Sequence, residues 1–257
     1  MSPPKTPTGT HMTFGEHLEA LRRTLWLCLI GVGAAFVVCC IFGTSIVNVL
    51  TAPVIDALKD AGYKEPSLYA FNLVDPFLVY CKVSLIAALF VSAPWVAYLL
   101  WKFAASGLYP HERKYVYIYG PATVLLFITG VVFSYLVIVR YGIRFLVEFG
   151  KTMHVTPMPG IDTQIMFVLV LSLVMGLVFQ LPLVMLILAK IGIVDSKTYA
   201  KHRKMFIIVA VIVAAVITPT QDAFNLCLAT APILVLYEIG IWISRIAERR
   251  KRKDLAG

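Results

Sequence analysis

Residues 94–114 read PWVAYLLWKFAASGLYPHERK, and this stretch decides how the rest of the chain is interpreted. Its first half is apolar and rich in Trp and Tyr, which favour the boundary between membrane and water. Gly107 and Pro110 then predict a turn, and an apolar run resumes at Tyr115. The stretch therefore predicts the end of one membrane span, a tight loop and the start of the next span.

The predicted loop holds one acidic residue among basic neighbours. Glu112 lies between His111 and the pair Arg113-Lys114. A carboxylate held in a basic interfacial loop suits a cationic ligand. The alternative is a solvated turn whose local ion pairs each contribute well under about 1 kcal/mol. The residues alone leave both interpretations open.

The composition is that of an integral membrane protein. Of the 257 residues, 60% are hydrophobic and 14% are charged, whereas a soluble domain carries about 25% charged residues. The net charge of +9 comes from short basic clusters between long apolar runs. Such clusters are typical of membrane topology signals, so no nucleic-acid partner is expected.

The sequence contains no recognisable catalytic or metal-binding motif. Four of the five cysteines lie in apolar runs, and none forms a CxxC pair with histidines at zinc spacing. A phosphate-binding loop and a GxSxG nucleophile elbow are also absent from the sequence. We therefore expect no enzyme activity, no cofactor, no metal site and no disulfide framework.

Apolar segments predict an all-α polytopic membrane protein with six transmembrane helices. The expected spans are residues 25–47, 83–100, 115–139, 165–189, 205–217 and 224–243. A helix of about 20 residues crosses the hydrocarbon core, and the first four spans meet that length. The fifth has 13 apolar residues, a rise of roughly 20 Å. The last two helices are therefore expected to form a shortened hairpin, or the bilayer thins around them.

The chain divides into a membrane domain and two terminal tails. Residues 1–13 are rich in Pro, Thr and Gly and are expected to be disordered. Residues 14–245 form the membrane domain, which starts with an amphipathic surface helix at Phe14. Residues 246–257 form a basic tail that suits anionic lipids.

The distribution of basic residues predicts the orientation. If the N-terminus is inside, 17 of the 23 Lys and Arg residues fall on the cytoplasmic side. This excess predicts that both termini are cytoplasmic. The first outside loop, residues 48–82, is expected to carry a short helix near Val54 and Leu58, and the second, residues 148–164, is expected to be extended.

Polar residues inside the apolar runs are the remaining candidates for function. Gln180 precedes Pro182 by two residues, and proline predicts a kink there. Gln180 either hydrogen-bonds a neighbouring helix, worth about 1 kcal/mol, or lines a polar, substrate-facing groove. Asp222 is expected to cap the last helix. Glu238 is expected to pair with Arg245 or to reach the interface.

Several motifs, in order along the chain, resemble those of one family. They are HLEALR at residues 17–22, PxxxYxxWxF at 94–103, GLYxHER at 107–113, FSY at 133–135, FQxP at 179–182, TP with a following Asp at 218–222, and YEIG at 237–240. Together they resemble the TatC subunit of the twin-arginine protein translocase. The resemblance covers roughly residues 14–245, essentially the whole predicted membrane domain.

This resemblance implies a glove-shaped receptor in the bacterial cytoplasmic membrane that exports folded proteins using the proton-motive force. Its implied partners are TatA- and TatB-like single-span subunits, twin-arginine signal peptides and other TatC copies. Carried over by position, the signal-peptide site comprises Glu112, Arg22, Phe103, Glu19, His17 and Arg113. The groove and partner contacts comprise Gln180, Pro182, Asp222, Tyr135 and Glu238.

The chain also departs from the family pattern. Ala20 stands where the N-terminal motif usually has a second acidic residue, and Leu99 and Leu226 replace glutamines. Ser106 and Arg140 replace prolines. These departures suggest a specialised paralogue with weakened recognition of the arginine pair. The competing interpretation, a small-solute secondary transporter, predicts an internal repeat and midspan charges, and neither is found in the first four spans.

Overall fold

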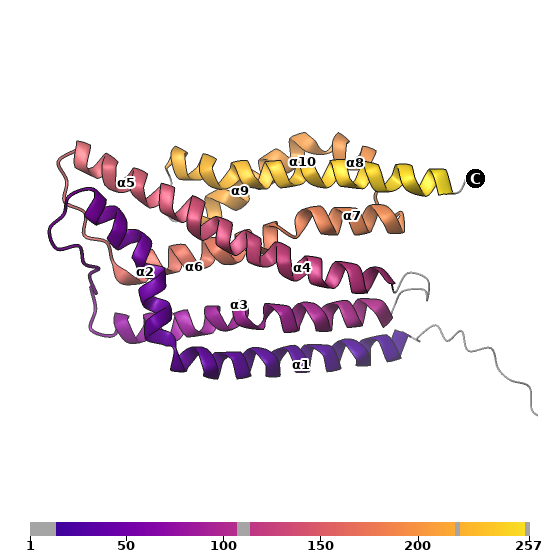
Figure 1. The fold of residues 1–257 in the computed structure, drawn as a ribbon, viewed down its shortest axis with the longest axis horizontal. Coiled ribbons are helices and arrows are strands. Elements are labelled where there is room, and N and C mark those ends of the chain that lie inside the picture. The colour runs from indigo at the N-terminus through magenta and orange to yellow at the C-terminus, as the bar shows by residue number, and fades with distance from the viewer. Residues whose placement is uncertain (1–13, 107–113, 219–221, 255–257) are drawn as a thin grey trace, which may run out of the picture.

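The computed structural model describes residues 14–106, 114–218 and 222–254, and these parts are almost entirely helical (Figure 1). The elements are α1 (Phe14–Ile41), α2 (Gly43–Asp60), α3 (Asp75–Ser106), α4 (Lys114–Phe133), the π-helical η1 (Ser134–Val139), α5 (Arg140–Thr152), α6 (Ile161–Val178), α7 (Leu181–Ile191), α8 (Ser196–Lys201), α9 (Arg203–Ile217) and α10 (Ala223–Asp254). Most of the long helices lie side by side along the longest axis of the molecule.

Within the described residues, five helical stretches are long and apolar enough to cross a membrane, namely residues 18–41, 75–103, 119–152, 161–191 and 223–249. With the 15-residue α9, which rises about 22 Å, they account for the six predicted apolar segments. Helix α9 is short, as expected. Helix α10 runs for 32 residues, because the helix continues through most of the basic segment that was expected to be a separate tail.

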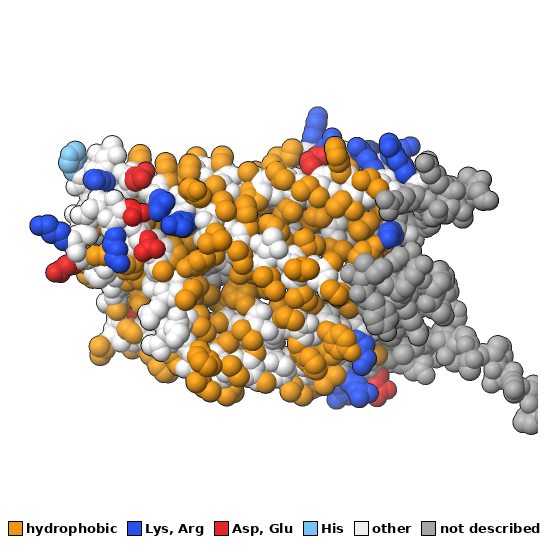
Figure 2. Space-filling view, viewed as in Figure 1, with side chains coloured by type: hydrophobic (Ala, Val, Ile, Leu, Met, Phe, Trp, Pro, Cys, Tyr) orange, Lys and Arg blue, Asp and Glu red, His pale blue; other side chains and the backbone are white. Residues whose placement is uncertain are grey.

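The surface pattern fits a bilayer. Figure 2 shows a broad apolar band between two ends where the charged side chains gather. A bundle whose lipid-facing side chains are apolar and whose ends are charged matches the hydrocarbon core and the flanking headgroup layers. Helix α1 contributes Leu29, Val37 and Ile41 to this exposed surface.

Helix α1 is attached to the bundle through α3. The Trp95 ring lies against Gly31, where a side chain would collide with it, and its Nε1 donates to the Leu27 carbonyl at 3.3 Å. Near the C-terminal end of α1, the Tyr80 hydroxyl donates to the Cys40 carbonyl. Aromatic side chains of α3 therefore fasten both halves of α1.

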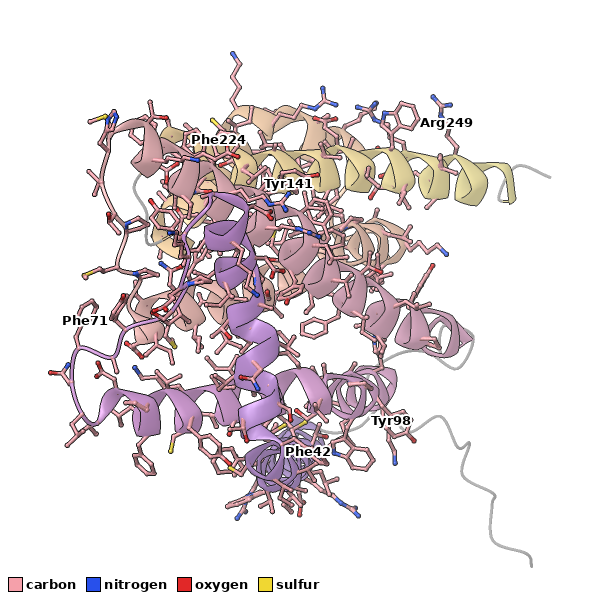
Figure 3. The ribbon with its side chains drawn as sticks, turned by 60° about the vertical axis from the view of Figure 1, so that its left-hand side comes forward. Phe42, Phe71, Tyr98, Tyr141, Phe224 and Arg249 are labelled. Carbon is pink, nitrogen blue, oxygen red and sulfur yellow. The ribbon has the colours of Figure 1, made fainter. Side chains whose placement is uncertain are left out.

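Helix α2 crosses from the end of α1 towards α5 (Figure 3). Its Val54, Ala57 and Leu58 are buried in the main core, together with Leu171 and Met175 of α6. The short helix predicted in the first outside loop is therefore confirmed, although it begins already at Gly43.

Several helix ends and connections gather at the two ends of the bundle. The start of α1, the flanks of residues 107–113, the α7–α8 connection and the end of α10 lie at one end, called here the inner end (Figure 1). The connections of residues 61–74 and 153–160 lie at the other, the outer end. These two run side by side, with the Tyr69 amide donating to the Pro159 carbonyl at 3.0 Å. Residues 148–152 are helical, so the second connection is extended over less of its length than expected.

Candidate functional site: a polar-floored groove between helices α3, α4, α6 and α7

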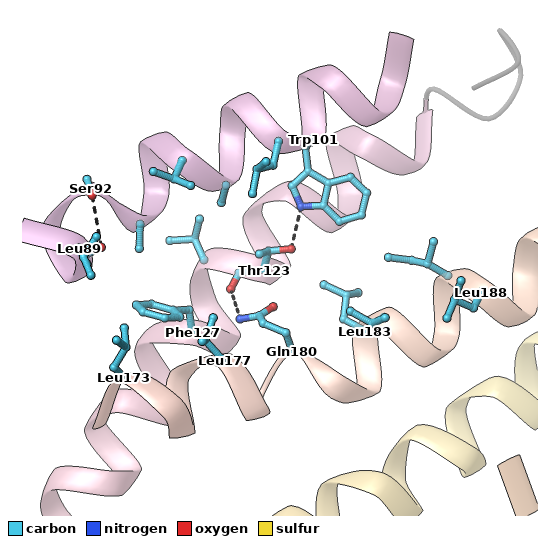
Figure 4. A pocket seen from close by; sticks show the side chains of 17 residues that line it. Leu89, Ser92, Trp101, Thr123, Phe127, Leu173, Leu177, Gln180, Leu183 and Leu188 are labelled. Carbon is cyan, nitrogen blue, oxygen red and sulfur yellow. Dashed lines mark hydrogen bonds between the residues drawn. The ribbon is translucent and has the colours of Figure 1, made fainter. Parts of the chain in front are cut away.

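Helices α3, α4, α6 and α7 enclose an apolar groove of about 690 Å³ (Figure 4). Its walls include Val96, Phe127, Leu177 and Leu188, and Gln180 is among its few polar residues. Ligand sites in proteins are typically about 300–1,000 Å³, mostly apolar, with a few placed polar groups. The groove has both properties.

Gln180 reaches the groove because the fourth span is broken beside it. Helix α6 ends at Val178 and α7 starts at Leu181, with Pro182 in the first turn of α7. Proline lacks an amide proton and its ring collides with the carbonyl four residues earlier, which is Val178 here, so it favours a break at this point. The predicted kink is confirmed.

The side-chain amide nitrogen of Gln180 has a hydrogen-bond partner, whereas its side-chain oxygen does not have one among the described residues. Its Nε2 donates to the Thr123 carbonyl of α4 at 3.0 Å, which confirms the expected bond to a neighbouring helix. Its Oε1 is buried and has no hydrogen-bond donor among the described residues. A buried acceptor without a donor costs roughly 1–3 kcal/mol. The structure therefore leaves one buried acceptor beside the groove without a donor among the described residues.

A series of polar contacts leads from Gln180 towards the inner end. Trp101 Nε1 donates to Thr123 Oγ1 at 2.8 Å, and that hydroxyl donates to the Tyr119 carbonyl at 2.9 Å. Lys190 Nζ donates to the Tyr119 hydroxyl at 2.6 Å. Because each contact joins a different pair of elements or turns, the series fixes α3 and α7 against α4 along one wall of the groove.

Two glycines bring α4 and α6 together at the base of the groove. A Cβ on Gly130 would lie 2.7 Å from the Met175 carbonyl oxygen and 3.0 Å from the Gly176 Cα. A Cβ on Gly176 would lie 2.7 Å from the Phe127 ring. Small residues that let backbones approach are typical of helix crossings in membranes. This crossing sets the width of the groove near Gln180.

The residues predicted for the signal-peptide site lie at the inner end where the structure describes them. Arg22 and Glu19 are exposed on the first turns of α1, and Phe103 is half-buried near the end of α3. A shallow hollow along α1 is lined by Leu18, Leu21, Arg22, Leu25, Trp26 and Leu29. Glu112 and Arg113 lie outside the described residues, as does the side chain of His17.

The residues predicted for the groove are spread over several places. Gln180 lines the groove. The Tyr135 hydroxyl donates to the Val49 carbonyl at 2.6 Å and so joins η1 to α2. Pro182 lies beside Gly240 of α10, because a Cβ added to Gly240 would lie 3.3 Å from the Cα of Pro182.

The other two predicted groove residues belong to the start and the middle of α10. Asp222 accepts from the Asn225 amide at 2.7 Å, so the predicted helix cap is confirmed. Glu238 accepts from Arg203 at 2.7 Å and not from Arg245. Residues seven apart on one helix are separated by about 10 Å along its axis, whereas α9 packs beside α10 and brings Arg203 directly to Glu238.

Sequence reasoning missed a junction at the inner end. The Ser196 amide and hydroxyl both donate to the Glu248 carboxylate, the hydroxyl at 2.6 Å. The Tyr237 hydroxyl donates to the Tyr199 carbonyl at 2.9 Å. Burial raises the pKa of the Tyr199 phenol. These partners are 38–52 residues apart in sequence, and no local pattern announces them.

Replacing Glu248 by alanine is expected to release α8 from α10. The carboxylate holds two donors at the start of α8, and hydrogen bonds to a charged group contribute about 1.5–3 kcal/mol each. Amide exchange in residues 196–201 should therefore accelerate by at least about one order of magnitude, because about 1.4 kcal/mol already corresponds to tenfold. Arg249→Ala, which removes an exposed neighbour, is the matched control. Equal exchange in both variants would show that the junction does not hold α8.

Comparison with known proteins gives a consistent result. The sequence model of a family described as "Sec-independent protein translocase protein (TatC)" matches residues 16–232. A TatC protein of Koribacter versatilis (strain Ellin345) is 36% identical over 246 residues, covering 95% of this chain and 90% of the relative. TatCy of Bacillus subtilis (strain 168) is 35% identical, covering 95% and 93%.

Solved structures agree with the sequence relatives. A crystal structure described as that of the twin arginine translocase receptor TatC superposes with a TM-score of 0.81 at 29% identity, covering 90% of this chain and 99% of the other. A second crystal structure of that receptor, in DDM, gives 0.80 at 30% identity.

Proposed function

Because the chain belongs to the TatC family of Sec-independent protein translocase proteins, we propose that it acts as the signal-peptide receptor subunit of a twin-arginine translocase. The observation that carries the proposal is the likeness of the fold to the twin arginine translocase receptor over 90% of the chain. The chain is a multi-pass membrane protein and a translocase component, not an enzyme. The small-solute transporter interpretation is not favoured.

We place the protein in the bacterial cytoplasmic membrane with its inner end facing the cytoplasm. The support is the basic excess, with 17 of 23 Lys and Arg residues falling in the segments of that end. Cytoplasmic segments of membrane proteins carry such an excess. Both chain termini would then be cytoplasmic, and the basic end of α10 would meet anionic headgroups.

The receptor site would form where residues 107–113 meet the first turns of α1. Glu112 would pair with the signal peptide's arginines, with Glu19, His17, Arg22, Phe103 and Arg113 around it. Guanidinium and carboxylate form charge-assisted bidentate pairs that lysine cannot reproduce. The start of α1, which carries Glu19 and Arg22, and the end of α3, which carries Phe103, lie at the inner end and support this arrangement (Figure 1).

The groove would take a transmembrane helix of a TatA- or TatB-like subunit. Its apolar walls suit a helix surface, and a small shift of the Gln180 side chain on docking would bring its buried Oε1 to a polar side chain on that helix. Interhelical hydrogen bonds in membranes contribute on the order of 1 kcal/mol. Tyr135, Asp222 and Glu238 lie outside the groove, and any partner contact of theirs would be separate.

We also propose that recognition of the arginine pair is weakened, as in a specialised paralogue or a subunit that works beside a second TatC copy. Ala20 is half-buried on α1, whereas the adjacent Glu19 is exposed. Neighbouring positions on a helix differ by about 100° in direction, so Glu19 cannot present its carboxylate where residue 20 would. One of two receptor carboxylates is then missing.

Site-specific photo-crosslinking from position 112 in inverted membrane vesicles tests the receptor role. The probe is a signal peptide carrying either Arg-Arg or Lys-Lys. We expect an adduct with Arg-Arg that is lost with Lys-Lys, because the carboxylate geometry is specific for guanidinium. Absence of any adduct, in vesicles where a TatC protein with both acidic residues does crosslink, would reject the receptor role.

A further inference from the structure

The connection between α2 and α3 carries an exposed apolar tip at the outer end of the bundle. The side chain of Leu73 is 98% exposed, that of Phe71 69% and that of Val74 56%. Figure 3 shows Phe71 at the periphery of the molecule. Contiguous apolar side chains that face outward mark surfaces that meet a partner or a membrane.

This apolar tip is held in place on both sides. Before it, the Tyr69 carbonyl accepts from the Ile161 amide at 2.9 Å. After it, the Asn72 amide donates to the Asp75 carboxylate at 2.9 Å. The Phe71 ring also lies against Gly160, where a Cβ would come within 2.7 Å of it. The tip is therefore displayed by a fixed backbone, and little conformational entropy would be lost when it binds.

The length of α3 sets the depth of the tip relative to the bilayer. The membrane-crossing part of α3, Asp75–Phe103, has 29 residues and a length of about 43 Å. The hydrocarbon core is about 30 Å thick, and the bilayer with its interfacial layers about 40–45 Å. Both ends of α3 therefore reach the interfacial layers. Trp101, whose type favours this layer, lies near the inner end, so Asp75 lies in the layer of the opposite leaflet.

The exposed apolar side chains at the start of α3 adjoin the tip. Phe77 is 67% exposed and Leu78 is also exposed, on the first turn of α3. A membrane-spanning surface that continues into a neighbouring apolar segment points to lipid as the occupant. The polar side chains of the tip also favour lipid as the occupant. Asn72 Nδ2 donates to Asp75 at 3.2 Å, so these two side chains bond each other and offer little to the polar rim of a protein interface.

We propose that Phe71, Leu73, Val74 and Phe77 insert into the outer-end leaflet and anchor the connection to the lipid surface. Apolar faces of interfacial segments bury about 5–10 Å into the boundary between headgroups and acyl chains. The anchor fixes the height of α2 and α3 in the bilayer. It requires that α3 spans the membrane and is independent of the proposed receptor role.

Depth-dependent fluorescence quenching tests the anchor in the full-length chain. All native cysteines (Cys28, Cys39, Cys40, Cys81 and Cys227) are replaced by alanine or serine. The Leu73→Cys chain is labelled with an environment-sensitive fluorophore and reconstituted into phosphatidylcholine vesicles containing lipids brominated near the top of their acyl chains. We expect a blue-shifted emission and the loss of most of the fluorescence. Because the brominated lipid is in both leaflets, the direction of insertion does not affect this quenching, and iodide is supplied on both sides of the vesicle membrane for the comparisons.

Two comparisons make the result specific. A label at Glu65→Cys, on a polar part of the same connection, should be quenched by aqueous iodide and not by the brominated lipid. A label at Val74→Cys should behave like that at position 73. Adding Phe71→Asp to the Leu73→Cys chain should weaken insertion of the tip, so that iodide quenches the label at position 73. The proposal is overturned if positions 73 and 74 respond to iodide alone, or if they are shielded from both quenchers, since the latter indicates a protein partner.

Discussion

Replacement of Gly130 by valine is expected to force α4 away from α6 and to lower the free energy of unfolding by roughly 3 kcal/mol or more. A Cβ at this position would lie 2.7 Å from the carbonyl oxygen of Met175, an atom of a helix backbone that cannot rotate away. Overpacking against flexible side chains is relieved by rotamer changes. Overpacking against backbone requires the whole helix to move.

The same displacement would disrupt the groove. Phe127 and Leu177 line its walls from the two helices that Gly130 holds together. Thermal unfolding of the purified protein in detergent measures the loss, and Gly130→Ala should show a smaller one of the same sign. The matched control is Gly33→Val on exposed α1, where a Cβ meets no atom within 4 Å. Equal melting temperatures for Gly130→Val and Gly33→Val would contradict the close approach.

The sequence predicts best the features that are encoded within a few residues. Apolar length predicts the spans, Pro182 predicts the break after Val178, and Asp222 predicts the cap on α10. In each case the physical cause, a run of apolar residues, a missing amide proton or a nearby carboxylate, lies within one or two turns of its effect.

Features that depend on distant pairs could not be predicted in this way. Gly130 looks like an ordinary residue of an apolar run until Met175 is placed beside it. Ser196 and Glu248 are 52 residues apart, and Glu238 pairs across helices with Arg203. The register between two helices decides such contacts, and the sequence of either helix alone does not contain it.

The candidate site likewise has features that the local sequence predicts and features that depend on distant contacts. Gln180 was identified from its rarity inside an apolar run, and the structure adds that its amide is bonded while its carbonyl oxygen is not. The exposed apolar tip at Leu73 was missed. In sequence, it resembles the start of a span, and its exposure depends on the pairing of Tyr69 with the second outer connection.

Replacement of Gln180 by leucine is expected to separate stability from transport. The change removes the bond to the Thr123 carbonyl, worth about 1 kcal/mol or less in a membrane, and also removes a buried acceptor whose lack of a donor costs roughly as much. The melting temperature of the purified protein should therefore stay near the original value or rise. Crosslinking from the groove to a TatA- or TatB-like helix, and export of a reporter carrying a twin-arginine signal, should fall severely.

The loss would follow because the partner's polar side chain no longer finds an acceptor in a groove that excludes water, and an unsatisfied polar group in an apolar site costs more than the bond itself contributes. Val184→Leu, which alters the same groove wall and keeps Gln180, is the control and should retain export. Unimpaired export by Gln180→Leu would remove the acceptor from the partner site. A large fall in melting temperature would instead make Gln180 a structural bridge between α4 and the break before α7.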